Sequence, residues 1–66
     1  MPIIQNNCKE TGWQQRLKRD LRDRLDVDLL NLNCAYDGDF CRTLAREFSM
    51  EFTMMQEHNY GCFRKS

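Results

Sequence analysis

The 66-residue sequence is poor in the residues that interrupt regular structure, with one proline and three glycines. This scarcity excludes a disordered linker and a turn-dense β module. The sequence also lacks any apolar run near the ~18 residues that a membrane-spanning helix needs. Neither sign of charge is in excess, since ten basic residues balance ten acidic ones. Zero net charge argues against a dedicated nucleic-acid-binding protein and against a membrane-surface peptide.

The N-terminal segment, residues 1–7, lacks the basic start and apolar stretch of a secretion signal. We therefore expect either a mature fragment with an added Met1 or a protein that uses no cleaved signal. The length suffices for one domain over residues 1–66, and a domain this small buries only about 60% of its unfolded surface. Disulfides, a metal ion or a second copy would support such a core.

A first helix is expected over residues 12–33. Thr11 and Gln14 have the spacing of a capping box, which indicates where the helix starts. Apolar residues then recur about every fourth position on one helix face: Trp13, Leu17, Leu21, Leu25, Leu29 and Leu32. The opposite face alternates arginine with aspartate, which is typical of a solvated, salt-bridged surface rather than a nucleic-acid-binding one.

A second helix is expected over residues 40–59. Asp37-Gly38 is a strong turn signal, and Asp39 is a natural N-cap for the segment that follows. The apolar face would consist of Phe40, Leu44, Phe48, Phe52 and Met55. Because a short connection favours antiparallel neighbours, the predicted fold is all-α, an antiparallel two-helix hairpin.

The four cysteines would lie at the two ends of this hairpin. Cys34 and Cys41 flank the loop, whereas Cys8 and Cys62 lie at the open end, roughly 30 Å away along helices that rise 1.5 Å per residue. A cystine needs Cα atoms within about 7 Å, so the geometry predicts nested Cys34–Cys41 and Cys8–Cys62 disulfides. Two cystines favour a disulfide-permissive compartment, such as that of a secreted protein, over the cytoplasm.

Two other uses of the cysteines stay open. Free, buried thiols would suit an intracellular regulatory protein. A small zinc-binding module could use Cys34, Cys41, His58 and Cys62, which are chemically suited to tetrahedral zinc. Their spacing is poor for zinc, however, because the two half-sites fall at opposite ends of the hairpin.

No catalytic site and no cofactor are expected. His58 is the sole histidine, and Cys62 is the only nucleophile near it in sequence. A Cys–His pair needs a third, orienting group and a cleft, and two helices offer little concavity.

Four apolar residues fall outside the two apolar faces and predict a contact surface: Val27, Leu30, Met50 and Met54. Methionine-rich patches suit adaptable protein contacts. The partner would be another protein or a second copy, and a two-fold dimer would give a four-helix bundle. The sequence thus predicts a non-enzymatic, helical protein-binding module. Such a module could be a secreted ligand, toxin or inhibitor, or an accessory subunit of an assembly.

Overall fold

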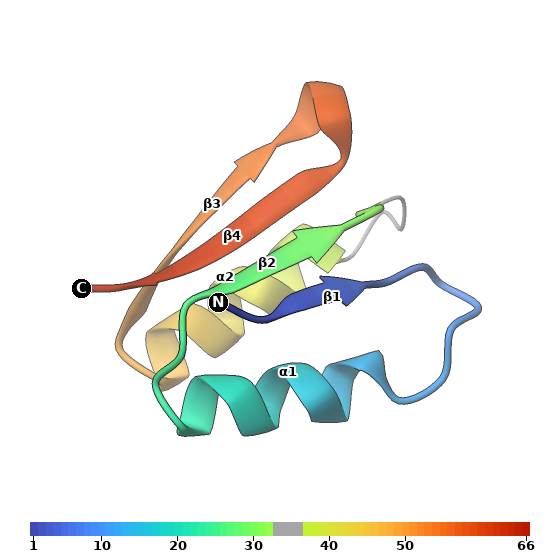
Figure 1. Cartoon of the computed structure of the whole chain (residues 1–66). Coiled ribbons are helices and arrows are strands. Elements are labelled where there is room, and N and C mark those ends of the chain that lie inside the picture. Colours follow the sequence, from blue (N-terminus) through green and yellow to red (C-terminus); the bar gives the residue numbers. More distant parts are fainter. Residues whose placement is uncertain (33–36) are drawn as a thin grey trace.

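The computed structural model of the chain describes residues 1–32 and 37–66 and has two layers, a four-stranded sheet and a pair of helices (Figure 1). The elements follow one another as β1 (Ile3–Gln5), α1 (Trp13–Arg22), β2 (Val27–Leu30), α2 (Asp37–Glu47), β3 (Met50–Met55), the 3₁₀ turn η1 (Gln56–His58) and β4 (Tyr60–Lys65). The all-α prediction is therefore wrong, and the fold is α/β.

The sheet has the strand order β1-β2-β4-β3. β1 and β2 are parallel, whereas β4 is antiparallel to both β2 and β3. A parallel pair needs a crossover connection, and here α1 supplies it. Both helices lie on one face of the sheet, and no described element covers the other face (Figure 1).

The first predicted helix is too long, because α1 ends at Arg22. The amide of Arg24 donates to Leu21 O at 2.9 Å, and that of Leu25 donates to Asp20 O at 3.0 Å. Arg24 has a φ of 59°, in the left-handed region. These two hydrogen bonds and the left-handed Arg24 together form a Schellman motif at the C-terminus of α1. The chain then becomes extended, and Val27–Leu30 form β2 instead of a further helical turn.

The second predicted helix contains one helix and part of a hairpin. α2 ends at Glu47, and Ser49, with a φ of 56°, turns the chain into β3. Along β3 exposure alternates, with Glu51 and Thr53 exposed and Phe52 and Met54 half-buried. This period of two belongs to a strand with one buried face.

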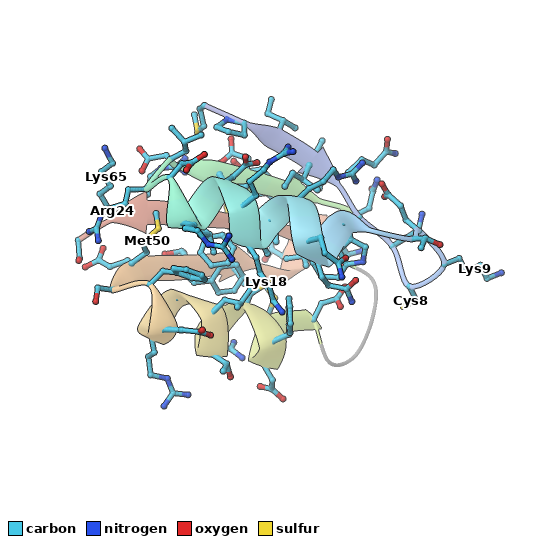
Figure 2. The ribbon with its side chains drawn as sticks, turned by 90° about the horizontal axis from the view of Figure 1, so that it is seen from below. Cys8, Lys9, Lys18, Arg24, Met50 and Lys65 are labelled. Atoms are coloured by element: carbon cyan, nitrogen blue, oxygen red, sulfur yellow. The ribbon has the colours of Figure 1, made fainter. Side chains whose placement is uncertain are left out.

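The core lies between the helices and the sheet. Leu17 and Leu21 of α1 and Cys41 of α2 are fully buried, and so are Leu29 and Phe63 of the sheet. Figure 2, viewed from the helix side, shows α1 and α2 side by side with Lys18 between them. The two helices already cover one sheet, so a four-helix bundle is not the way this core closes.

Neither predicted cystine forms, because Cys41 and Cys62 are both free thiols. Cys41 points into the core from α2, whereas Cys62 pairs in register with Asp28 and Thr53 on the sheet. Cys34 lies outside the described residues. The helical hairpin with nested Cys34–Cys41 and Cys8–Cys62 disulfides is thus replaced by a sheet.

The zinc alternative is not supported by the positions of its ligands. Within residues 1–32 and 37–66 no three histidine, cysteine, aspartate or glutamate side chains cluster as metal ligands would. His58 lies exposed in η1, and Cys41 is buried in the core. The same described residues include no helix with the length and apolarity to cross a bilayer.

Candidate functional site

β1 is an edge strand whose backbone is paired on one side. The amide of Asp28 donates to Pro2 O, and the amide of Asn6 donates to Leu30 O, both at 3.0 Å. In a parallel pair the groups facing the neighbour come from every second residue, here the even-numbered ones. The N–H and C=O groups of Ile3 and Gln5 therefore point away from the sheet and are free to pair with another strand.

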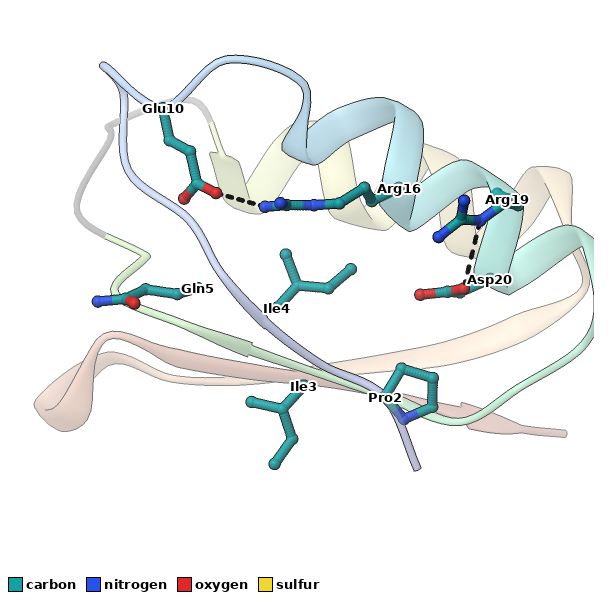
Figure 3. A pocket seen from close by; sticks show the side chains of 8 residues that line it. All are labelled: Pro2, Ile3, Ile4, Gln5, Glu10, Arg16, Arg19 and Asp20. Carbon is teal, nitrogen blue, oxygen red and sulfur yellow. Dashed lines mark hydrogen bonds and ion pairs between the residues drawn. The ribbon is translucent and has the colours of Figure 1, made fainter.

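A groove of about 440 Å³ lies along this free edge, between β1 and α1 (Figure 3). Ile4 points toward α1 and is 5% exposed, so it forms an apolar floor. Ile3 points to the opposite side and is 65% exposed. The full lining comprises Pro2, Ile3, Ile4, Gln5, Glu10, Arg16, Arg19 and Asp20.

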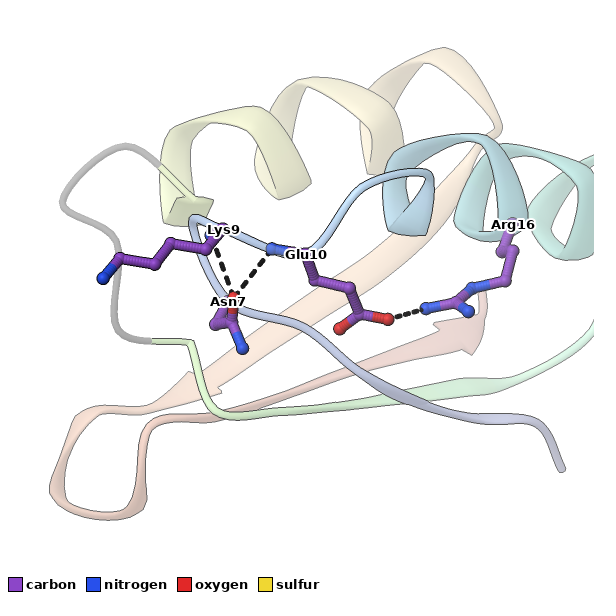
Figure 4. A network of polar contacts seen from close by, with 4 residues as sticks. All are labelled: Asn7, Lys9, Glu10 and Arg16. Carbon is purple, nitrogen blue, oxygen red and sulfur yellow. Dashed lines mark hydrogen bonds and ion pairs between the residues drawn. The ribbon is translucent and has the colours of Figure 1, made fainter.

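The charges that line the groove are paired. Arg16 forms an ion pair with Glu10, and Arg19 lies 3.9 Å from Asp20. Glu10 is held in place because the side-chain oxygen of Asn7 accepts the amides of Lys9 and Glu10, at 2.9 and 2.8 Å (Figure 4). The groove therefore presents polar side chains without a net charge.

The connection from β1 to α1 depends on Gly12. Gly12 has a φ of 89°, in the left-handed region that glycine enters without steric cost, and it serves as the N-cap of α1. The capping box predicted from Thr11 and Gln14 is wrong, since the cap makes no side-chain hydrogen bond. This turn places Arg16 and Arg19 beside β1.

A buried polar pair fixes the C-terminal end of β1. Asn6 is fully buried and donates from Nδ2 to Oδ2 of Asp37 at 3.3 Å. Desolvation raises the pKa of Asp37, and the hydrogen bond from Asn6 lowers it in part. The pair ties β1 to the first residue of α2.

A second hollow, of about 590 Å³, is lined by residues 8–15 and Asp37. None of these residues belongs to a strand, so this hollow offers no strand edge to a ligand. The β1 groove is the stronger candidate, because it combines a concave surface with unpaired backbone groups.

The uncovered face of the sheet carries a polar cluster at its centre. Arg64 Nη2 lies 3.1 Å from Asp28 Oδ1, although the geometry is that of an ion pair rather than a directed hydrogen bond. A hydrogen bond to Asp28 raises the pKa of the Tyr60 hydroxyl, and Asp28 also raises the pKa of Arg64. Cys62 pairs in register with Asp28. The cluster is therefore held by an ion pair, and it keeps one buried oxygen, Asp28 Oδ1, that accepts no directed hydrogen bond.

The four predicted contact residues do not share one surface. Val27 and Met50 are in the core, and Met54 is half-buried beside α2. Leu30 remains accessible, 38% exposed at the end of β2. The prediction of protein binding itself stays a prediction, and of the four residues only Leu30 offers it an exposed side chain.

The residues that make the groove were not predicted from the sequence. Arg16 and Arg19 fall on the arginine–aspartate face of the first predicted helix, and Ile3 and Gln5 fall in no predicted element. The only signal for β1 is the pair Ile3-Ile4, which is too short to establish a strand period.

The chain matches no family model, no curated protein and no solved structure in the comparisons with known proteins.

Proposed function

We propose that the protein is a non-enzymatic binding module that takes an extended segment of a partner protein as an additional strand along β1. The observation that carries the proposal is the groove of about 440 Å³ that runs beside the outward-facing backbone groups of Ile3 and Gln5. In strand addition, main-chain hydrogen bonds give affinity, and pockets for alternate side chains give specificity.

The charges of the groove favour a peptide over a nucleic acid. A phosphate backbone is bound by cations whose charge is available to it. Both groove arginines instead have an acidic neighbour, Glu10 for Arg16 and Asp20 for Arg19. A peptide backbone is neutral and needs no net positive charge, so it is the better match.

The side chains of the added strand would alternate between two environments, as in any strand. Those on the helix side would enter the groove, where an apolar side chain fits over Ile4 between the two ion pairs. Those on the other side would lie near Ile3, which is exposed on the uncovered face. The preferred segment thus has an apolar residue flanked, two positions away, by polar ones.

The shortness of β1 limits the affinity. Each backbone hydrogen bond contributes about 0.5–1.5 kcal/mol net. The few groups of Ile3 and Gln5 therefore fall short of the roughly 8 kcal/mol that micromolar binding needs. Contacts inside the groove must supply the remainder, so the lining residues should set the specificity.

A peptide selection tests the proposal. Random peptides displayed on phage are selected against the wild-type protein, and the enriched peptides are titrated against Gln5→Pro. Proline removes the outward N–H of residue 5, and an edge strand tolerates it because that N–H is not used in the sheet. We expect Gln5→Pro to bind the peptides up to about tenfold more weakly than the wild type does. A tenfold loss equals about 1.4 kcal/mol, which matches the loss of one hydrogen bond.

The matched control is Gln5→Ala, which also removes the glutamine side chain but keeps the N–H, and it should bind more tightly than Gln5→Pro. Circular dichroism establishes that both variants are folded. Failure to enrich any peptide, or equal binding to Gln5→Pro and Gln5→Ala, would show that β1 is not the binding edge.

A further inference from the structure

β3 is the other edge of the sheet, and it differs from β1 in length. It spans six residues, and each pairs in register with β4 on one side only. No strand in the described part of the chain lies along its outer side. Since β1 spans three residues, β3 presents the longer row of unpaired backbone groups.

β3 also lacks the features that protect edge strands from pairing. Such edges are usually short or carry proline, lysine or a bulge. β3 reads Met-Glu-Phe-Thr-Met-Met, with no proline and with Glu51 as its one charged residue.

Apolar side chains lie along the free edge of β3. Phe52 and Met54 are half-buried on the helix side, and Met55 is 48% exposed on the other side. The ring of Phe52 packs against Phe63 with centroids 4.8 Å apart. Gly38 of α2 lies so near Met54 that an added Cβ there would come within 3.3 Å of Met54 Cε. These side chains are therefore anchored and still partly accessible.

We infer that β3 pairs antiparallel with β3 of a second copy of this chain, about a two-fold axis perpendicular to the sheet and centred on Thr53. The axis keeps the helices of both copies on one face and joins the two sheets into one of eight strands. Phe52 then faces Met54 of the second copy twice, a favourable aromatic–thioether contact. Glu51 faces Met55, so no like charges oppose each other.

The charge of the chain agrees with a second copy as the occupant, and the size of the contact limits its strength. The net charge is zero, so two copies do not repel each other at long range. Stable interfaces bury about 1,200 Å² or more, which is more than the pairing of a single strand supplies. The flank of α2, which packs on β3, adds to the contact, and we expect a weak dimer that depends on concentration.

Sedimentation velocity from about 10 μM to about 1 mM, a range that brackets weak association, tests this surface. The wild type should shift from monomer to dimer as concentration rises. Thr53→Lys and Thr53→Glu each place two like charges at the centre of the contact and should weaken the dimer by about tenfold or more. An equimolar mixture of the two variants should associate again, because opposite charges then meet. Thr53 is exposed, so both variants should fold.

Gln5→Lys, at the other edge, is the control and should leave the dimer unchanged. Three results would overturn the inference. They are a wild type that stays monomeric at every concentration, a dimer that survives in Thr53→Lys, and a dimer that tightens in Thr53→Lys. The last result would place Thr53 opposite Glu51 and contradict the register.

Discussion

Asp37 begins α2 with its carboxyl buried against the amide of Asn6. A buried charge is costly unless it is well paired. The side-chain oxygen of Asn6, Oδ1, is also buried and has no hydrogen-bond partner. The pair joins residues 31 positions apart, the last residue before the loop and the first of α2. The pair therefore fixes the C-terminal end of β1, but it leaves one buried polar atom without a hydrogen bond.

The stability of the fold should depend on pH through Asp37. Burial raises its pKa above the ordinary value of 3.8, so the folded state binds more protons than the unfolded state between the two values. The contribution of Asp37 to the free energy of unfolding then falls as pH rises through this window. Relative to the wild type, Asp37→Asn should therefore gain stability as pH rises. Urea unfolding from about pH 3 to about pH 7 measures the difference.

Asp39→Asn controls for the loss of a negative charge in the first turn of α2, because Asp39 is exposed. It should not reproduce the gain. A difference between Asp37→Asn and wild type that stays flat, or shrinks as pH rises, would mean that Asp37 is not buried as described.

Cys41 has a role that the number of cysteines in the sequence does not predict. The side chain of Cys41 is fully buried, and burial, with the nearby charge of Asp37, raises its pKa to about 12. It acts as a small apolar core residue. An even cysteine count in a short chain predicted disulfides, but the count says nothing about which side of a sheet each thiol faces.

At the scale of elements, left-handed residues end helices and strands without glycine. Among the described residues, Arg24, Asn31, Ser49 and Asn59 have φ between 47° and 64°. Each costs about 1–2 kcal/mol relative to a right-handed conformation, although asparagine tolerates it better. Tertiary packing holds them there.

Arg24→Gly should stabilise the protein by about 1 kcal/mol, because glycine enters the left-handed region without steric cost. In the helical hairpin that the sequence predicted, the same change would lie inside a helix and destabilise it by about 1 kcal/mol. The sign of the change in urea midpoint thus distinguishes the two folds. Arg22→Gly, within the last turn of α1, should destabilise the protein and serves as the control. A loss of stability in Arg24→Gly would contradict the ending of α1 at Arg22.

The sequence predicted the helical segments better than their ends. Trp13, Leu17 and Leu21 share the buried face of α1, and Leu44 is buried in α2. Leu25, predicted to continue that face, is instead 41% exposed. The scarcity of glycine and proline argues against a turn-dense β module, yet the chain makes turns at Arg24 and Ser49 without either residue.

The strands were missed because their spacing also fits a helix. Leu25 and Leu29 are four residues apart, yet only Leu29 lies in a strand. Gly61 lies in β4, although residues 40–59 just before it were expected to be helical, and an added Cβ at Gly61 would come within 2.7 Å of both Leu32 and Phe52. Glycine there permits the close approach of the buried Leu32 and the half-buried Phe52.

At the scale of the molecule, the two sheet edges differ in ways that suit different partners. β1 is short and has a groove beside it, which fits a segment of another protein. β3 is longer and fits its own copy. Neither site was predictable, because both depend on the strand order. The β1 groove depends in addition on the pairing of β1 with a strand 25 positions later in the chain.

Amide hydrogen exchange on the protein with a selected peptide tests strand addition at β1 most directly. The amides of Ile3 and Gln5 should slow by about tenfold or more, since they gain hydrogen bonds. Those of Ile4 and Asn6 already face β2 and should change little. Slowing at Glu51 to Met55 instead, or none at Ile3 and Gln5, would contradict the proposed site.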